Sequence, residues 1–356
     1  MLARSFAGSV STTIAPLLLA LWAASISAGC EHTKPAQTID SSPASAPASP
    51  AHAPPTAAAG TRQPHAQAGF YRARVGAVDV TVVSDGTLAL DVAHGLALNA
   101  QPGEVERLLA QSFQKSPIEA SFNEFVISGN GRVALIDTGA SANFGPTAGK
   151  LQISLANAGI HATDVSDVFL THVHPDHSGG LLADGQCAFP NATVHLDSKD
   201  LAYWTDAERA AKATGMAATF FATARAALEP YRAAGRLKAF TGATEFFPGF
   251  RAEPAYGHTP GHVVYVLESG EQKLLFLGDM IHIPAVQFED PNVAVGFDVD
   301  PALAVATRKR VLSEVAEHGF LVAHNHVAFP GLGHVRRDGD SYRWLPAPYV
   351  NDAPAQ

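Results

Sequence analysis

From about residue 69 onward, short apolar runs alternate with longer segments of helical spacing. Apolar residues that alternate with polar ones, or short apolar runs bounded by glycine, predict strands. The predicted strands cover residues 70–75, 78–83, 122–128, 133–137, 168–170, 193–196, 250–255, 263–267, 273–277 and 320–323. Ser84-Asp85-Gly86 predicts a turn, and Gly129-Asn130-Gly131 predicts a hairpin between two of these strands.

Helical spacing recurs over residues 104–114, 146–158, where Gly159 ends the pattern, and 206–234, which is rich in alanine. A better-marked helix has Asp300 as its N-cap, Pro301 at its first position and Gly319 just past its end. Strands and helices thus alternate in two similar halves. This pattern predicts an α+β fold in which two mixed sheets pack face to face with helices outside, as a four-layer sandwich.

The first 68 residues have a different character. Residues 1–30 are typical of an export signal, with Arg4 before the apolar stretch 14–22 and small residues leading to Cys30. Cleavage near Ala28 and lipidation of Cys30 are the two alternatives, and we expect lipidation. Residues 31–68 are mostly Pro, Ala, Ser and Thr and predict a disordered linker before one folded domain over 69–356. The expected location is therefore periplasmic, lipid-anchored or secreted.

Composition narrows the class of protein. The hydrophobic fraction of 47% is ample for a core, and the formal net charge of -9 disfavours nucleic acid and anionic membranes as partners. Any attachment to a membrane would go through a lipid on Cys30. The chain has 16 His and only 2 Cys, so its candidate chemistry lies in imidazole rather than in thiolate or disulfides.

One stretch concentrates that chemistry, Thr171-His172-Val173-His174-Pro175-Asp176-His177-Ser178-Gly179-Gly180, directly after a predicted buried strand. A lone His-x-His is common on exposed loops. Here a carboxylate, a third imidazole and a glycine turn follow it, and these ligand types suit zinc and its first-row neighbours. The density of ligands predicts two ions.

The second half supplies further candidates, each at the end of a predicted strand. They are Gly257-His258-Thr259-Pro260-Gly261-His262, then Gly278-Asp279, then His324-Asn325-His326. Singly these are weak signals, because an Asp after a strand is more often a turn cap. Jointly they complete two coordination spheres.

His-x-His-x-Asp-His, Thr-Pro-Gly-His, Gly-Asp and a late His together resemble the signature of the metallo-β-lactamase fold superfamily, over about residues 70–349. Within it the chain looks most similar to the methyl parathion hydrolases. The segments that carry this are 112–115, 137–140, 144–147, 285–288 and 329–334. The resemblance implies the four-layer fold, a homodimer and two divalent ions, with Zn²⁺ expected and Mn²⁺, Co²⁺ or Fe²⁺ as alternatives.

The resemblance also implies a ligand set. His172, His174 and His262 would hold one ion, Asp176, His177 and His326 the other, and Asp279 would bridge both. Asp176 and Asp279 are the expected catalytic carboxylates. His258 and Asp137 are expected to support the ligands from behind, with turn capping as the alternative for Asp137. His324 departs from the family pattern, and we expect it to support the ligands too, with a surface position as the alternative. The pocket is expected to include Phe144, Trp204, one of Phe220 or Phe221, and His282, with packing as the alternative for each of these, and His334 is a further candidate.

Two ions about 3.5–4 Å apart can share a solvent molecule and lower its pKa, so that hydroxide forms near neutral pH. The predicted activity is therefore hydrolysis of neutral ester-type bonds in small uncharged substrates. Aryl phosphotriesters come first by resemblance, and lactones or aryl esters are the alternative. A β-lactamase, a nuclease and a non-catalytic metal-binding lipoprotein are less favoured.

Overall fold

The computed structural model describes residues 67–92, 95–129 and 131–351. These residues belong to the second of two units into which the chain divides, Gln63–Gln356. The predicted export signal, Cys30 and most of the predicted linker lie outside the described residues. No helix in the described part of the chain is long and apolar enough to cross a membrane.

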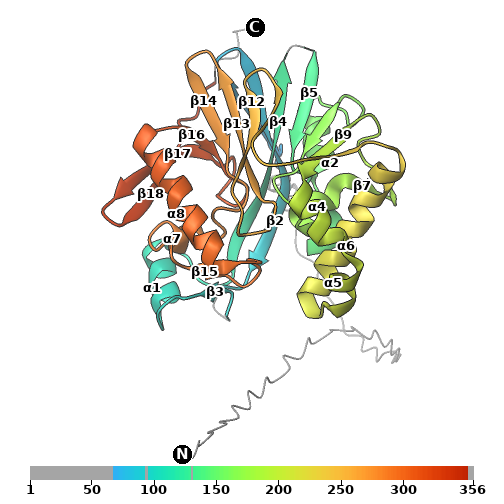
Figure 1. Ribbon diagram of the computed structural model, residues 1–356. Helices are drawn as coiled ribbons and strands as arrows, with labels where there is room; N and C mark the ends of the chain where they lie inside the picture. Colours follow the sequence, from blue (N-terminus) through green and yellow to red (C-terminus); the bar gives the residue numbers. More distant parts are fainter. Residues whose placement is uncertain (1–66, 93–94, 130, 352–356) are drawn as a thin grey trace, which may run out of the picture. The chain divides into compact units, whose positions relative to one another are not determined.

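The first half of the folded unit forms one seven-stranded sheet of order β1-β2-β4-β5-β6-β9-β10 (Figure 1). Its strands are β1 (Phe70–Val75), β2 (Val78–Leu90), β4 (Ile118–Gly129), β5 (Arg132–Ile136), β6 (Asp167–Phe169), β9 (Thr193–Asp197) and β10 (Leu237–Phe240). The first four strands are antiparallel neighbours, whereas β5, β6, β9 and β10 run parallel to one another. The parallel strands therefore end at the same edge of the sheet.

The second half forms another seven-stranded sheet, of order β11-β12-β13-β14-β16-β17-β18. Its strands are β11 (Thr244–Phe247), β12 (Phe250–Pro254), β13 (Val263–Ser269), β14 (Gln272–Phe276), β16 (Leu321–Ala323), β17 (Leu332–Asp338) and β18 (Ser341–Pro346). Only β14 and β16 pair in parallel, and their ends release the chain towards Asp279 and His326.

Helices and short strands complete the unit. The helices are α1 (Glu104–Gln111), α2 (Leu151–Asn157), α3 (Pro175–Ser178), α4 (Ser198–Thr205), α5 (Ala207–Lys212), α6 (Gly215–Ala233), α7 (Pro284–Gln287) and α8 (Pro301–His318), with 3₁₀ turns η1 (Ser141–Phe144) and η2 (Gly179–Leu181). Two small sheets pair β3 (Ala97–Leu98) with β15 (Ala294–Val295), and β7 (Leu182–Ala183) with β8 (Gln186–Cys187).

The buried side chains fall into layers that match the predicted sandwich. Aromatic residues fill the space between the two sheets, among them Phe125, Phe169, Phe250, Tyr265 and Phe276. A second core lies between the first sheet and helices α2, α4 and α6, and a third between the second sheet and α8. Figure 1 shows these helices on the outer faces of the two sheets. The predicted four-layer α+β architecture is confirmed.

Local signals predicted some element boundaries well. Helix α8 has Asp300 as its N-cap, whose Oδ1 accepts a hydrogen bond from Leu303 N at 3.0 Å, and Gly319 follows its end with φ 65°. Strand β5 pairs antiparallel with β4 across the predicted hairpin. These features are set by a few neighbouring residues, which is why the sequence pattern is sufficient for them.

Other predicted boundaries were wrong. The turn at Ser84-Asp85-Gly86 is a bulge inside β2, because the Asp85 carboxylate turns inward and accepts hydrogen bonds from the backbone of the loop before α2. The helix predicted over 146–158 begins only at Leu151. The helical region predicted over 206–234 is divided into α5 and α6, because Ala213 and Thr214 between them have extended backbone.

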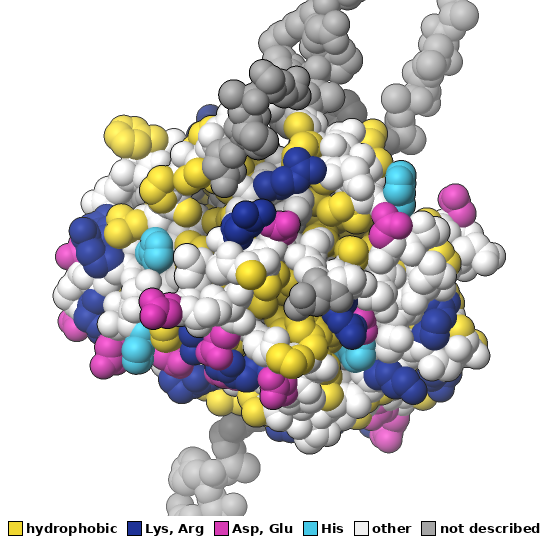
Figure 2. All heavy atoms as spheres, turned by 90° about the horizontal axis from the view of Figure 1, so that it is seen from above, with side chains coloured by type: hydrophobic (Ala, Val, Ile, Leu, Met, Phe, Trp, Pro, Cys, Tyr) yellow, Lys and Arg dark blue, Asp and Glu magenta, His cyan; other side chains and the backbone are white. Residues whose placement is uncertain are grey.

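Charged side chains of both signs are interspersed around a hollow lined by apolar side chains on the face seen from above (Figure 2). Over its described residues, this face carries no continuous basic surface of the kind that binds nucleic acid. That nucleic acid is not a partner stays a prediction from the net charge.

Candidate metal centre

The segments that carry the candidate ligands meet at one edge of the sandwich. The chain leaves β6 into His172–Ser178, which contains α3, and it turns between β12 and β13 at 255–262. It reaches Asp279 directly after β14 and His324–His326 directly after β16. Because each segment follows a short buried strand, the sheets fix where its side chains start.

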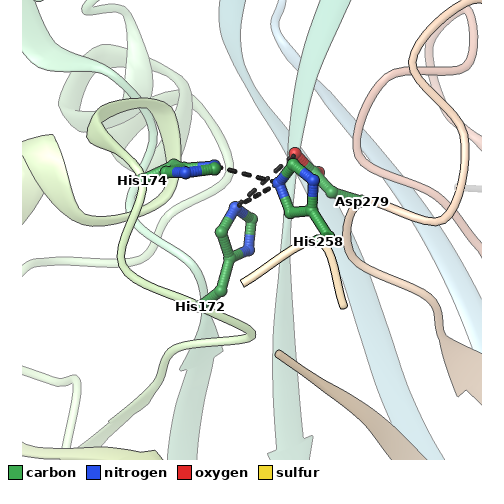
Figure 3. Close-up of side chains that lie close together, drawn as sticks. All are labelled: His172, His174, His258 and Asp279. Atoms are coloured by element: carbon green, nitrogen blue, oxygen red, sulfur yellow. Dashed lines mark hydrogen bonds and ion pairs between the residues drawn. The ribbon is translucent and has the colours of Figure 1, made fainter. Parts of the chain in front are cut away.

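Four side chains form the first cluster: His172, His174, His258 and Asp279, all buried (Figure 3). The Nε2 atom of His258 lies 3.2 Å from Nε2 of His172, 2.9 Å from Nδ1 of His174 and 3.2 Å from Oδ2 of Asp279. The three imidazole rings and the carboxylate therefore point at one small volume. The candidate metal ligands around this volume come from segments that follow strands of both sheets.

The second cluster consists of Asp176, His177, Asp279 and His326. Oδ1 of Asp279 lies 3.0 Å from Nε2 of His177 and 3.0 Å from Nε2 of His326. Oδ2 of Asp176, which is the most exposed of the four, lies 3.5 Å from Nε2 of His326. Asp279 thus contributes one carboxylate oxygen to each cluster, as a bridging ligand would.

The far sides of the rings decide which nitrogen faces the centre. The Thr171 hydroxyl donates to Asp137, so it accepts a hydrogen bond from Nδ1–H of His172. Nδ1–H of His258 donates to Oδ1 of Asp298 at 2.8 Å. In the neutral rings of His172 and His258 the proton is therefore on Nδ1, and Nε2 presents a lone pair to the centre. His174 differs, because its Nδ1 is the atom that faces the cluster.

The same arrangement holds in the second cluster. Nδ1 of His177 donates to Oδ2 of Asp137 at 2.9 Å, and Nδ1 of His326 donates to the carbonyl oxygen of Ser121 at 2.9 Å. Nε2 of His177 and Oδ1 of Asp279 are buried without a hydrogen-bond partner among the described residues. Lone pairs that converge without protons require a cation, and imidazole and carboxylate suit a divalent one. The residues present fit two ions such as zinc.

The pKa values of the metal-free site also indicate that it needs positive charge. Burial would lower the pKa of His258, but hydrogen bonds to Asp279 and Asp298 outweigh burial and raise it to about 9. Burial also lowers the pKa of His177, yet Asp279 and Asp137 hold it well above its ordinary value. Burial would raise the pKa of Asp279, whereas the imidazoles of His177 and its neighbours hold it well below. Protons therefore take the place of cations in the metal-free protein.

The prediction for His258 and His262 was wrong, because each residue has the role that was expected of the other. His258 belongs to the first cluster, where we expected His262. Nδ1 of His262 donates to the carbonyl oxygen of Ala255 at 3.2 Å, and Nε2 accepts from the backbone N–H of Asp279 at 2.9 Å. With both nitrogens engaged, His262 holds the Asp279 backbone and has no lone pair left for an ion.

Gly278 makes this contact possible. Its φ is 56°, and a Cβ atom there would lie 2.5 Å from Nε2 of His262. Only glycine therefore allows the His262 ring to approach the backbone of Asp279.

Asp137 lies where it was expected, behind the ligands. It is fully buried, and its carboxylate accepts hydrogen bonds from Thr171, from His177 and from the side-chain amide of Asn325. It therefore joins the loop after β6 to the loop after β16. Asp298 performs the same task for His258. No local pattern marked it, because it lies in an irregular segment.

His324 is fully buried beside His326 but in neither cluster. Its Nδ1 accepts from the backbone N–H of His326 at 3.3 Å, and its Nε2 has no partner among the described residues. Burial, together with the charge of His326, holds the pKa of His324 well below its ordinary value. It supports the backbone of His326 as a neutral ring.

A pocket of about 100 Å³ opens beside both clusters. Its walls are mostly apolar and include three of the residues predicted for them. The lining consists of Leu88, Leu90, Ala120, Phe122, Phe144, His174, Asp176, Met216, Phe220, Asp279, His282, Phe297 and His326. His282 also places its Nε2 2.8 Å from Oδ2 of Asp279.

Of the pair Phe220 and Phe221, it is Phe220 that lines the pocket, and the expectations for Trp204 and His334 were wrong. Trp204 and Phe221 are buried in the core between the first sheet and its helices and do not line the pocket. Trp204 instead packs edge-on against His174, with ring centroids 5.2 Å apart. His334 lies on β17, where its Nδ1 contacts the carbonyl oxygen of Gly319 at the end of α8. Helical and strand positions alone did not separate pocket from core.

Comparison with known proteins identifies this arrangement. A model of the metallo-beta-lactamase superfamily matches residues 123–326, more than half of the chain, and this span contains both clusters. The chain belongs to the metallo-beta-lactamase superfamily. A comparison with curated protein sequences finds no match.

Among solved structures of the superfamily, the crystal structure of hydrolase AbOPH is 32% identical, with a TM-score of 0.76, over 80% of this chain and 100% of that chain. AidC, a dizinc quorum-quenching lactonase in complex with a product, is 26% identical, with a TM-score of 0.72, over 80% and 99%. A probable metal-dependent hydrolase from Staphylococcus aureus shares the fold at 18% identity, with a TM-score of 0.63, over 78% and 100%. The chain is a metal-dependent hydrolase of this superfamily.

Proposed function

We propose that this hydrolase uses two divalent ions to cleave small, uncharged, apolar ester-type substrates, with lactones first and aryl phosphotriesters second. The observation that carries the proposal is the apolar wall opposite the ligand clusters. Leu88, Leu90, Phe144, Met216, Phe220 and Phe297 contribute to this wall, and none of the described residues that line it is Lys or Arg. An anionic substituent of the substrate would find no Lys or Arg side chain there to pair with.

Two bound divalent ions would polarise the carbonyl or phosphoryl oxygen of the substrate and lower the pKa of a water molecule. The protein holds the ligands for this chemistry. Asp279 spans both clusters with its two oxygens, while Asp137 and Asp298 keep the ring protons away from the centre. The apolar wall excludes bulk water from the side where an acyl or aryl group would lie.

Two likenesses rank the substrates. AidC, which this chain resembles over most of its length, is a lactonase, and this supports lactones. The sequence segments that resemble methyl parathion hydrolases support aryl phosphotriesters as the second candidate. Both substrate classes combine an uncharged reacting centre with an apolar substituent.

A substrate panel on one purified sample tests the proposal. Zinc-loaded protein is assayed with N-hexanoyl-homoserine lactone, dihydrocoumarin, p-nitrophenyl acetate and methyl parathion, and a phosphodiester and nitrocefin serve as controls. We expect turnover of at least one lactone that is lost with a chelator and restored by zinc, and little activity on the controls. Absence of turnover for all four esters would reject the proposal, and two tightly bound ions without turnover would favour a metal-binding role.

A further inference from the structure

The carboxylate of Asp200 is fully buried at the first turn of α4, where it has no ion pair with any described Lys or Arg. It accepts three hydrogen bonds instead. Oδ1 accepts from the backbone N–H of Gly261 at 2.6 Å, and Oδ2 accepts from the backbone N–H of Val173 and the hydroxyl of Thr259, both at 2.9 Å. Burial raises the pKa of Asp200 to about 6, so its charge at neutral pH is kept at a cost.

All three donors belong to the two loops that carry the histidines of the first cluster. Val173 lies between His172 and His174, in the loop after β6, and Thr259 and Gly261 follow His258, in the loop between β12 and β13. One backbone hydrogen bond joins the loops directly, from Val263 N to the carbonyl oxygen of Thr171 at 2.9 Å. Besides the contacts among the ligand imidazoles themselves, Asp200 therefore adds a second polar connection, with three hydrogen bonds, between the two loops.

The second loop also packs directly against the start of α4. A Cβ atom at Gly261 would lie 2.5 Å from the backbone nitrogen of Asp200 and 2.9 Å from its Cβ. The loop can approach the helix this closely only because residue 261 is glycine. The start of α4 therefore helps to fix the position of this loop, in addition to the backbone hydrogen bonds at the ends of its own strands.

We propose that Asp200 is a positioning residue, which sets how far His258 lies from His172 and His174 and so raises the affinity of the first cluster for its ion. It contacts neither the ion nor the substrate. The inference rests on the proposed function, because it assumes a site that holds two ions. Substitution of a residue that supports metal ligands in this way commonly lowers metal affinity by about 10–100-fold.

The chain offers a matched control. Asp85 is also a buried carboxylate that accepts backbone hydrogen bonds, from Ala140, Gly149 and Leu151, but none of these lies in a ligand-bearing loop. Asp200→Asn and Asp85→Asn each remove one carboxylate charge. In each variant, a side-chain NH₂ in place of Oδ1 would face one backbone N–H that has lost its acceptor. Only the first change affects the geometry of the first cluster.

The experiment measures zinc affinity and thermal unfolding of the full chain. Zinc binding is followed by competition with a chromophoric chelator, and Tm is measured on metal-free protein. We expect Asp200→Asn to lower the affinity for one of the two zinc ions about 10–100-fold and the affinity for the other by less than about threefold. Asp85→Asn should lower Tm without changing either zinc affinity.

A milder variant keeps the test decisive if Asp200→Asn does not fold. Thr259→Val removes the hydroxyl that donates to Asp200 with little change of side-chain shape. We expect the affinity for the same zinc ion to fall a few-fold. Unchanged zinc affinity in the folded variant, or equal weakening in Asp85→Asn, would overturn the inference. Wild-type protein that binds two ions but cleaves no substrate of the panel would reject the proposed function alone, and fewer than two bound ions in the wild type would reject both.

Discussion

At the scale of single residues, the position of each proton decides what the site can bind. Asp137 and Asp298 accept the Nδ1 protons of His177 and His258, so the Nε2 lone pairs converge on the Asp279 carboxylate. A centre made only of acceptors is unstable without a positive charge. Protons supply this charge in the metal-free protein, and they must leave when metal binds.

The exchange of His258 and His262 gives a direct test. We expect His258→Ala to lose one of two zinc ions after dialysis, because the first cluster loses a ligand. His262→Ala should keep two ions with weaker binding, because it loses only the acceptor for the Asp279 backbone. Metal content per chain, measured by elemental analysis, distinguishes them. The opposite pattern would restore His262 as the ligand.

Metal binding should also release protons in a pH-dependent way. The pKa of His258 is raised to about 9 in the metal-free protein, so the ring is protonated at pH 7 and neutral near pH 10. Its stabilising contribution is complete below about pH 6.5 and is lost as pH rises through about 9. Zinc affinity should therefore rise with pH up to about 9.

Calorimetry in buffers of different ionisation enthalpy measures this release. At pH 7 we expect His258→Ala to release about one proton fewer than the wild type for each chain loaded. Equal proton release by the two proteins at pH 7 would mean that His258 is already neutral there.

At the scale of elements, strand ends place the ligands, while helix α6 and the segment after β15 shape the pocket. The start of α6 contributes Met216 and Phe220, and the chain after β15 contributes Phe297. The capping signals of α8 were readable because they depend on adjacent residues. The break between α5 and α6 was missed because alanine-rich spacing continues through it.

A charge at the start of α6 should change substrate preference without unfolding the protein. Met216 is 52% exposed, so Met216→Glu should leave Tm within about 1 °C of the wild-type value. An apolar substituent that binds in the pocket would then have to remove water from the new carboxylate, which disfavours binding. We expect kcat/KM for N-hexanoyl-homoserine lactone to fall about tenfold, mainly through KM. Ile153→Glu, which is exposed on α2 and outside the pocket, should leave kinetics unchanged. Equal kinetics of the two variants would separate Met216 from substrate binding.

At the scale of the whole molecule, the two clusters join both halves of the sandwich. His172, His174 and His177 come from the first sheet, and His258, Asp279 and His326 come from the second. An ion in either cluster would therefore bind only the assembled sandwich. Metal binding becomes part of the free energy of folding.

Removal of metal should consequently destabilise the whole unit. Each ion present at a thousand times its Kd contributes about 4 kcal/mol to the free energy of unfolding. We expect a chelator to lower Tm of the zinc-loaded protein in one cooperative step, whereas the same chelator saturated with zinc should not. A Tm that does not respond to chelator would mean that the ions do not join the two sheets.

The sequence by itself determined the architecture and the ligand-bearing segments, because alternating apolar strands and helix caps are local patterns, and because imidazoles and carboxylates concentrate at strand ends. It could not choose between His258 and His262, which share one turn, nor separate pocket residues Phe144 and Phe220 from core residues Trp204 and Phe221. It also gave no sign that Asp200 and Asp298 support the ligands. Only the tertiary structure decided these points, since which nitrogen faces the centre depends on partners as distant in sequence as Ser121 is from His326, 205 positions.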